Sequence, residues 1–239
     1  MGELESKKIL SELTGKKNIY YVSKGRLAAE ILIDILPKRE ILLQEEGSWH
    51  TYPKLGDVLY LKMIDGKINV EDIQPNKILL INTMPAYAWL EDAKKVYEAC
   101  KQKKTIMIND VCGSIGKQQA KYGDYIIGSF GRWKPITIGQ GGFIATNEDL
   151  NVEEVMLDEK ALVEALKNIP KKLVRWEQKK QEVLKLIKKQ EIIAHEINIL
   201  TKRTETLINL LEKNNIEYEL CPKYIRTMKQ AISIEIKRW

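Results

Sequence analysis

Short apolar runs recur along the first 146 residues of the chain, and each is too short to form a helix. They are bounded by Gly, Pro, Asn, Asp or Lys, so each run is predicted to be a β-strand. The predicted strands are Ile19–Val22, Ile41–Leu43, Val58–Leu61, Ile78–Ile81, Thr105–Ile108, Tyr125–Ile127 and Gly142–Ala145. Several are apolar at consecutive positions, which is typical of strands covered on both faces. The pattern therefore predicts a mostly parallel sheet.

Segments with helical periodicity lie between these strands. Leu27–Leu36 has a continuous apolar face and stops before Pro37. Leu90–Lys103 has apolar residues at helical spacing, with acidic residues early and lysines late, an order that the helix dipole favours. The alternation of strands and helices predicts an α/β domain whose mostly parallel central sheet is sandwiched by helices.

The pattern changes in the second part of the chain. Residues 158–213 are rich in Lys, Glu, Leu and Ile, which predicts two or more long helices interrupted at Pro170. Two further strands are predicted, at Ile216–Leu220 and Ala231–Ile236. The sequence therefore predicts a small C-terminal α+β appendage, in which His195 lies on a helix and has no ligand role.

Length and composition agree with one large domain and a smaller appendage. The chain has 239 residues, and we expect the α/β domain in residues 1–155 and the appendage in residues 156–239. A hydrophobic content of 44% and a charged content of 30% exclude a disordered, collagen-like or disulfide-rich protein. The net charge of +6 is spread along the chain, without a basic block interleaved with aromatic residues. We therefore expect no nucleic-acid partner.

Cysteine, histidine and apolar stretches limit the chemistry and the location further. The three cysteines are widely separated, so they predict neither a disulfide framework nor a paired metal motif. Two histidines are too few for a multi-histidine metal site, and we expect no metal. No stretch approaches the ~20 apolar residues that span a bilayer, and the N-terminus lacks the apolar core of a secretory signal. We expect a cytoplasmic protein with no membrane partner.

Two turns of the first domain carry residues suited to a cofactor that has a phosphate and a flat ring. Gly25 and Arg26 follow a predicted strand and open a helix, where free backbone N–H groups favour a phosphate. Trp49 lies in an aromatic-rich turn after the next strand, and its face could stack on a heteroaromatic ring. A plain strand–turn–helix connection and a packed tryptophan are the alternative interpretations.

Two later segments add a carboxylate and an amine. Asp110 follows a buried strand at the edge where open α/β sheets place ligands, and a carboxylate there can hold a protonated pyridine nitrogen. Lys134 follows Ser129 by five residues, in a loop that leads to Gly141-Gly142. An amine so placed can form a Schiff base with a carbonyl, and the serine can donate to a phosphate. A helix N-cap at Asp110 and a surface lysine remain alternatives.

In this order the four segments resemble the pyridoxal-phosphate enzymes of fold type I, and within them the DegT/StrS-type sugar aminotransferases. The resemblance covers roughly residues 19–146 and is strongest from Asp110 onward. It implies that Lys134 forms the internal aldimine with pyridoxal 5'-phosphate, that Asp110 pairs with the pyridine nitrogen and that Trp49 stacks on the ring. It also implies that Gly25 and Arg26 bind the phosphate through backbone N–H groups, helped by the Ser129 hydroxyl.

The resemblance further implies transfer of an amino group from a small-molecule donor to a keto sugar or keto acid, in a homodimer. The chain departs from the family at Gly113, where a Gln is usual, at Arg26, where a Thr is usual, and in its short second part. Another reaction of the same cofactor, such as that of a lyase, a racemase or a sulfur- or selenium-transfer enzyme, is an alternative. A non-catalytic binding or assembly protein is another. His50 is either an extra acid–base group or a packed or solvent-facing ring.

Overall fold

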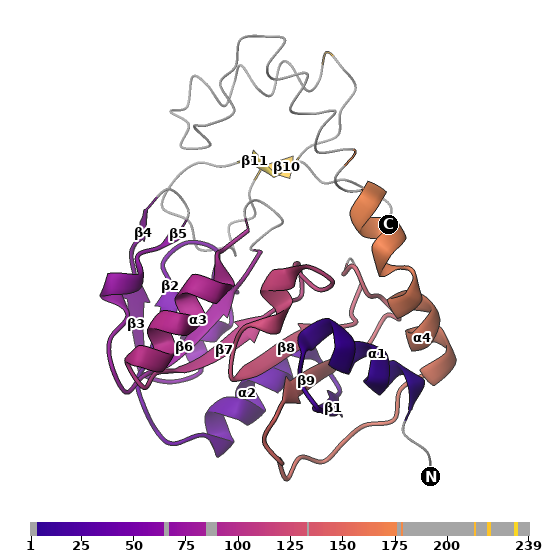
Figure 1. The fold of residues 1–239 in the computed structure, drawn as a ribbon, viewed down its shortest axis with the longest axis horizontal. Helices are drawn as coiled ribbons and strands as arrows, with labels where there is room; N and C mark the ends of the chain where they lie inside the picture. Colours follow the sequence, from indigo (N-terminus) through magenta and orange to yellow (C-terminus); the bar gives the residue numbers. More distant parts are fainter. Residues whose placement is uncertain are drawn as a thin grey trace.

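The structure, a computed structural model, has a seven-stranded mixed sheet at its centre (Figure 1). The sheet strands are β1 (Asn18–Val22), β2 (Ile41–Gln44), β3 (Val58–Leu61), β6 (Ile78–Asn82), β7 (Ile106–Asp110), β8 (Tyr125–Ser129) and β9 (Gly142–Thr146). The residues that the structure describes are 4–64, 67–84, 90–132, 134–175, 178, 213, 219–220 and 232–233. Each of the seven sheet strands overlaps one predicted apolar run, so the seven predicted strands are confirmed.

The strand order is β1-β9-β8-β7-β6-β2-β3, and the five strands from β8 to β3 are parallel. Strand β9 is antiparallel to both of its neighbours, β1 and β8. The register pairs Asn82 with Asp110, so the carboxyl ends of β6 and β7 meet at one edge of the sheet. The prediction of a mostly parallel sheet is confirmed, and the antiparallel β9 is the exception within it.

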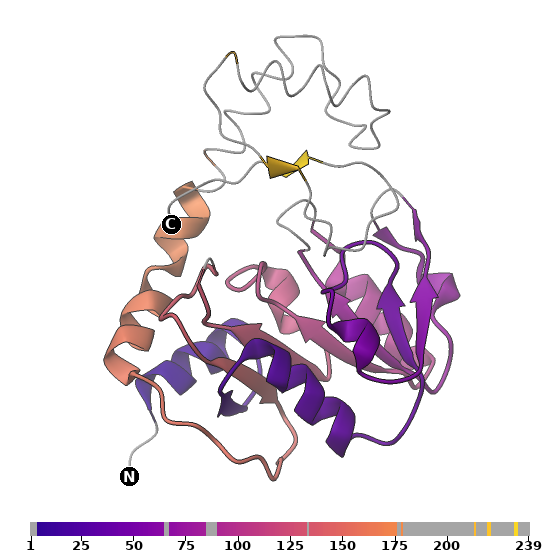
Figure 2. The same ribbon diagram turned by 180° about the vertical axis from the view of Figure 1, so that it is seen from behind.

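Helices cover both faces of the sheet. They are α1 (Glu5–Thr14), α2 (Gly25–Ile35), α3 (Ala93–Gln102) and α4 (Glu159–Lys167), with 3-10 turns η1 (Tyr52–Lys54), η2 (Val70–Asp72) and η4 (Gln118–Lys121). Figure 1 shows α1, α3 and α4 on one face, and Figure 2 shows α2 on the other. Strand β6 shows why both faces are apolar: Ile78 and Leu80 pack with α2, and Leu79 and Ile81 pack with α3. This confirms that helices sandwich the sheet.

The element boundaries differ from the sequence prediction in a consistent way. Four parallel strands continue past their apolar runs into polar residues at the carboxyl edge, and those residues are Gln44, Asn82, Asp110 and Ser129. Helix α3 begins after Asp92, not at Leu90, because the Asp92 carboxylate caps it by accepting from the Lys95 N–H at 3.2 Å. Helix α1 and the hairpin of β4 (Met63–Ile64) and β5 (Lys67–Ile68) were not predicted.

The second part of the chain is described only in pieces. Helix α4 packs against α1 through Leu162 and Leu166, and residues 169–175 are helical as well. Strands β10 (Glu219–Leu220) and β11 (Ile232–Ser233) pair antiparallel within the two segments predicted as strands. The rest of the predicted helices, including His195, lies outside the described residues, and the division at residue 155 stays a prediction. None of the helices in the described part of the chain is both long and apolar enough to cross a bilayer.

Candidate functional site

Polar side chains converge where the parallel strands end. Asn82 and Asp110 end neighbouring strands β6 and β7, and Ser129 ends β8 next to them. Gln44 ends β2, and its Oε1 accepts a hydrogen bond of 2.7 Å from the Asn82 N–H. Ligands of open parallel sheets bind at this edge, because the loops that follow the strands open there. The carboxyl edge is therefore the place to look for chemistry.

Asp110 is the buried carboxylate of this edge, with 5% of its surface exposed. Its Oδ2 accepts a hydrogen bond of 2.7 Å from the Tyr52 hydroxyl, and its Oδ1 accepts one of 2.9 Å from the Cys112 N–H. Burial, and then the Asp110 carboxylate, raise the pKa of Tyr52 well above its usual value, so the phenol stays neutral and donates. Two donors therefore fix the plane of the carboxylate.

Cys112 lies beside Asp110 and interacts with Lys134 and Ser129. Burial and the neighbouring Asp110 carboxylate raise the pKa of the Cys112 thiol well above its usual value, while the Lys134 ammonium and a contact with the Ser129 backbone oppose that shift. Asp110, Lys134 and Ser129, which were predicted to supply the carboxylate, the amine and a phosphate-binding hydroxyl, therefore all interact with this one thiol. Asp110 and Lys134 therefore both lie within electrostatic range of one thiol.

Lys134 and Trp49 face each other in this region. The Lys134 Nζ lies 5.1 Å from the centroid of the Trp49 ring, within the range of a cation–π contact. The Trp49 ring in turn lies 4.8 Å from that of His50, tilted by 55°. His50 is exposed, which agrees with the solvent-facing alternative. We call Asp110, Tyr52, Cys112, Lys134 and Trp49 the edge cluster.

A backbone cradle lies beside the edge cluster, at the start of α2. Gly25 opens the helix so close to β8 that an added Cβ would lie 2.7 Å from the Ser129 Cβ and 3.0 Å from the Gly128 carbonyl oxygen. Gly142 is similarly tight, since its Cβ would lie 2.6 Å from the Gly25 nitrogen. The Ser129 Oγ accepts from the Gly131 N–H at 3.2 Å. The glycines therefore bring a helix N-terminus against a serine hydroxyl, an arrangement suited to an anion.

The side chain of Arg26 points out of this cradle. Its Nε donates to Glu30 Oε1 at 2.6 Å along the surface of α2, and its side chain is 57% exposed. The structure thus gives the Arg26 guanidinium no part in the site. The prediction concerns only the Arg26 backbone N–H, which lies in the first turn of α2, where helical N–H groups have no partner within the helix.

Unpartnered polar atoms gather near Trp49. Among the residues that the structure describes, four buried side-chain atoms have no hydrogen-bond partner, and three of them lie between residues 44 and 51: Gln44 Nε2, Ser48 Oγ and Thr51 Oγ1. The fourth is the Ser114 Oγ. A buried polar atom without a partner costs about 1–3 kcal/mol, so such atoms mark places where a ligand or water supplies the bond.

Sequence reasoning missed Tyr52, Gln44 and Asn82. Tyr52 lies in the same aromatic-rich turn as Trp49, but its contact with Asp110 joins residues 58 positions apart, which no local pattern reveals. Asn82 was detectable, because it follows a buried strand just as Asp110 does. Gln44 follows the strand before it in the same way.

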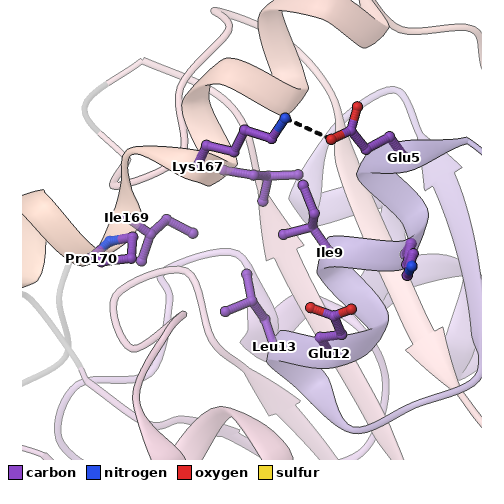
Figure 3. Close-up of a pocket in the computed structure, with 9 residues that line it drawn as sticks. Glu5, Ile9, Glu12, Leu13, Lys167, Ile169 and Pro170 are labelled. Carbon is purple, nitrogen blue, oxygen red and sulfur yellow. Dashed lines mark ion pairs between the residues drawn. The ribbon is translucent and has the colours of Figure 1, made fainter.

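A groove elsewhere on the surface does not take part in this arrangement. It lies between α1 and α4, has a volume of about 390 Å³, and is lined by apolar residues such as Ile9, Leu13 and Ile169 (Figure 3). The ion pair of Glu5 with Lys167, at 2.6 Å, crosses one end of it. It shares no lining residue with the edge cluster, and most of its lining is apolar, so we do not regard it as a site of chemistry.

Comparison with known proteins gives a fold but no close relative. No protein-family model matches the chain, and no curated protein matches it. Among solved structures, the chain is similar to PseC of Helicobacter pylori, an aminotransferase involved in the biosynthesis of pseudoaminic acid, with a TM-score of 0.68 and 17% identity over 93% of this chain and 77% of the other. The fold is that of the type I pyridoxal-phosphate-dependent transferases.

Further similar structures belong to proteins with different activities. A DegT DnrJ EryC1 StrS aminotransferase of Brucella abortus matches with a TM-score of 0.62 and 14% identity, over 77% of this chain and 63% of the other. A cysteine desulfurase of Thermococcus onnurineus has the same TM-score and identity, over 98% of this chain and 67% of the other. The chain spans about 60% of the length of several of these proteins, 59% for a 3-amino-5-hydroxybenzoic acid synthase.

Proposed function

We propose that this chain binds pyridoxal 5'-phosphate at the edge cluster through Lys134 and transfers amino groups between a small-molecule donor and a keto acceptor. The observation that carries the proposal is a chain of contacts: the Tyr52 hydroxyl donates to Asp110, and the Tyr52 N–H donates to the carbonyl of Trp49, whose ring lies 5.1 Å from the Lys134 Nζ. These contacts join Asp110 to Lys134. Those two residues are 24 positions apart, yet they share one region with the ring of Trp49. An acid, an amine and a flat ring in one place are the groups that this cofactor needs.

The residues fit the cofactor in chemistry as well as position. When bound, pyridoxal phosphate supplies an aldehyde and an electron-withdrawing ring. The Asp110 carboxylate would hold the proton at the ring nitrogen, and Trp49 would cover one face of the ring and exclude water. The N–H groups of Gly25 and Arg26, with the Ser129 hydroxyl, would hold the phosphate. The Lys134 Nζ would bind the aldehyde and move a proton between the donor's α-carbon and the cofactor's aldehyde carbon.

The activities of similar proteins support the choice of reaction and acceptor. Several are aminotransferases, and PseC is described as acting in the biosynthesis of pseudoaminic acid. We therefore propose a keto sugar or a keto acid as the acceptor. From the resemblance to enzymes of this fold, we also propose that a second copy helps to enclose the site, in a homodimer.

Titration with pyridoxal phosphate tests the proposal. The wild-type chain is expected to gain the visible absorption band of a lysine-bound cofactor, and an added amino acid is expected to bleach it with release of one keto acid. Lys134→Ala should lose the band completely. Lys172→Ala is the matched control, because Lys172 is a nearby half-buried lysine that donates to the Pro135 carbonyl at 2.7 Å. A band that survives Lys134→Ala, or no band in the wild type, would contradict the proposal.

A sulfur-transfer reaction is the second candidate, because a thiol lies beside the proposed cofactor lysine. In that reaction free cysteine would lose its sulfur to the Cys112 thiol, giving alanine and a persulfide. The raised pKa of Cys112 keeps it a neutral thiol, which is the weaker nucleophile, and so favours amino transfer. Incubation of the loaded protein with cysteine decides between the two, since only sulfur transfer releases alanine and is abolished by Cys112→Ala.

A further inference from the structure

Tyr52 holds a position that the proposed function leaves unexplained. It is only 3% exposed, lies in the turn η1 after Trp49, and is joined to that residue by its N–H, which donates to the Trp49 carbonyl at 2.9 Å. Its ring packs among the apolar residues under α2. Its hydroxyl reaches out of that core to Asp110 Oδ2 at 2.7 Å. A phenylalanine would fill the same apolar space, so the hydroxyl has a role of its own.

The hydroxyl acts on the one carboxylate of the edge cluster. An ionised carboxylate has about four lone-pair positions, and donors already occupy one on each oxygen of Asp110: the Tyr52 hydroxyl on Oδ2 and the Cys112 N–H on Oδ1. Each donor draws negative charge toward itself and away from whatever binds at the remaining positions. A hydrogen bond to a charged group is one of the stronger interactions in a buried region.

We propose that Tyr52 is a positioning residue that orients Asp110 and limits the negative charge that Asp110 presents to the cofactor's ring nitrogen. This inference rests on the proposed function. The hydrogen bond from Tyr52 to Asp110 would set both how tightly the site binds the cofactor and how tightly it holds the proton on the ring nitrogen. A site without the phenol would bind the protonated nitrogen more tightly, because the carboxylate would have one competing donor fewer.

The first test compares pyridoxal phosphate with its 1-deaza analogue, in which carbon replaces the ring nitrogen. If Tyr52 acts through Asp110 on that nitrogen, Tyr52→Phe raises the preference for the natural cofactor over the analogue about tenfold. A loss of packing alone would weaken both ligands equally. A preference that is unchanged or falls would overturn the inference. Tyr21→Phe is the control, because Tyr21 is equally buried and its hydroxyl bonds the Ser6 Oγ, not Asp110.

The second test needs no cofactor and therefore separates the inference from the proposed function. A buried phenol that donates to a carboxylate gives a hydroxyl proton resonance shifted far downfield and protected from exchange. Tyr52→Phe is expected to remove this resonance, Asp110→Asn to move it upfield, and Tyr21→Phe to leave it in place. If the wild type takes up no cofactor, the proposed function fails while this result still stands. If Asp110→Asn leaves the resonance unmoved, the inference fails whatever binds.

Discussion

Two clusters of this molecule each join a buried tyrosine to a carboxylate. They differ in whether the polar groups around them all have hydrogen-bond partners. In the first, which we call the clasp, Tyr21 contacts the Ser6 Oγ at 2.5 Å, and Ser6 donates from its Oγ and its N–H to Glu159. Tyr21 also donates its own N–H to Glu154 at 2.9 Å. The clasp thus ties α1, β1 and the start of α4 together, and its groups partner one another.

The edge cluster is built from the same kinds of groups but is left incomplete. Asp110 has two donors and room for more, and the turn around Trp49 carries buried Ser48 and Thr51 oxygens without a partner. A cluster that only stabilises the fold makes its hydrogen bonds within the protein, whereas a binding site leaves some donors and acceptors for a ligand. The comparison teaches that the incomplete cluster is where function is to be sought, and variants in each cluster test it.

The largest expected effect is that of Asp110→Asn. The amide keeps the size of the side chain but has no charge to hold a proton at the ring nitrogen, so amino transfer should slow about 100-fold. Single-turnover decay of the visible band after addition of an amino donor measures this rate. The free energy of unfolding should change little in comparison. A rate within threefold of the wild type, roughly 0.6 kcal/mol, would remove Asp110 from the proposed site.

Gly25→Ala is expected to have the next largest effect. The added methyl group meets Ser129 at 2.7 Å, so α2 must move away from β8, and the phosphate cradle opens. Overpacking of this kind costs about 1–3 kcal/mol, which corresponds to roughly 30-fold weaker binding of pyridoxal phosphate. Equilibrium titration with pyridoxal phosphate and with unphosphorylated pyridoxal gives the measurement. Equal loss for both ligands would show that the cradle does not bind the phosphate.

In the clasp, Tyr21→Phe should alter stability and leave cofactor binding unchanged. Burial is the main cause that raises the pKa of Tyr21 to about 12, from an ordinary value of about 10. The folded state therefore favours the neutral phenol, and that contribution is intact below pH about 10 and is lost as the pH rises toward about 12. Over that range, the free energy of unfolding of the variant should fall less than that of the wild type, by about 1–2 kcal/mol.

Urea unfolding at closely spaced pH values measures this difference. Parallel loss of stability in both proteins would show that Tyr21 ionises in the folded state as it does in solution. A lower affinity of Tyr21→Phe for pyridoxal phosphate would contradict the comparison, because the clasp would then contribute to cofactor binding.

The smallest expected effect is that of Trp49→Leu. Loss of ring stacking, worth about 0.5–1.5 kcal/mol, should weaken pyridoxal phosphate binding about fivefold. Trp49→Phe keeps an aromatic face and should bind within twofold of the wild type. Titration of the visible band compares the three proteins. If the leucine variant binds as well as the phenylalanine variant, Trp49 packs against Lys134 without stacking on the cofactor.

The sheet and two of its flanking helices were predictable because apolar runs report burial directly. Strand β6 is apolar at consecutive positions because both of its faces are covered, and the sequence shows this without knowledge of its neighbours. The prediction stopped each parallel strand at its last apolar residue. The structure continues β7 to Asp110 and β8 to Ser129, since backbone pairing does not depend on side-chain polarity. The polar ends that the pattern left out are those at the candidate site.

The site was predictable in its residues but not in its contacts. Asp110, Lys134 and Trp49 were singled out by their order along the chain; in the structure Lys134 lies over the Trp49 ring, and Tyr52 hydrogen-bonds both Asp110 and Trp49. The hydrogen bond from Tyr52 to Asp110 depends on how β2 and β7 are placed in the sheet, which is a property of the whole fold. Glycine at position 25 was assigned to a phosphate, whereas its close approach to Ser129 became evident only from the packing of α2 on β8.

Chemical trapping of the cofactor tests the central claim most directly. Borohydride reduction of the wild-type chain with pyridoxal phosphate, followed by digestion and mass spectrometry, identifies the lysine that carries it. Burial lowers the pKa values of Lys16 and Lys172, so these amines would react first if free amine alone decided the outcome. We predict that the label lies on Lys134 in a one-to-one ratio. A label on Lys16 or Lys172, or one spread over surface lysines, would contradict the account.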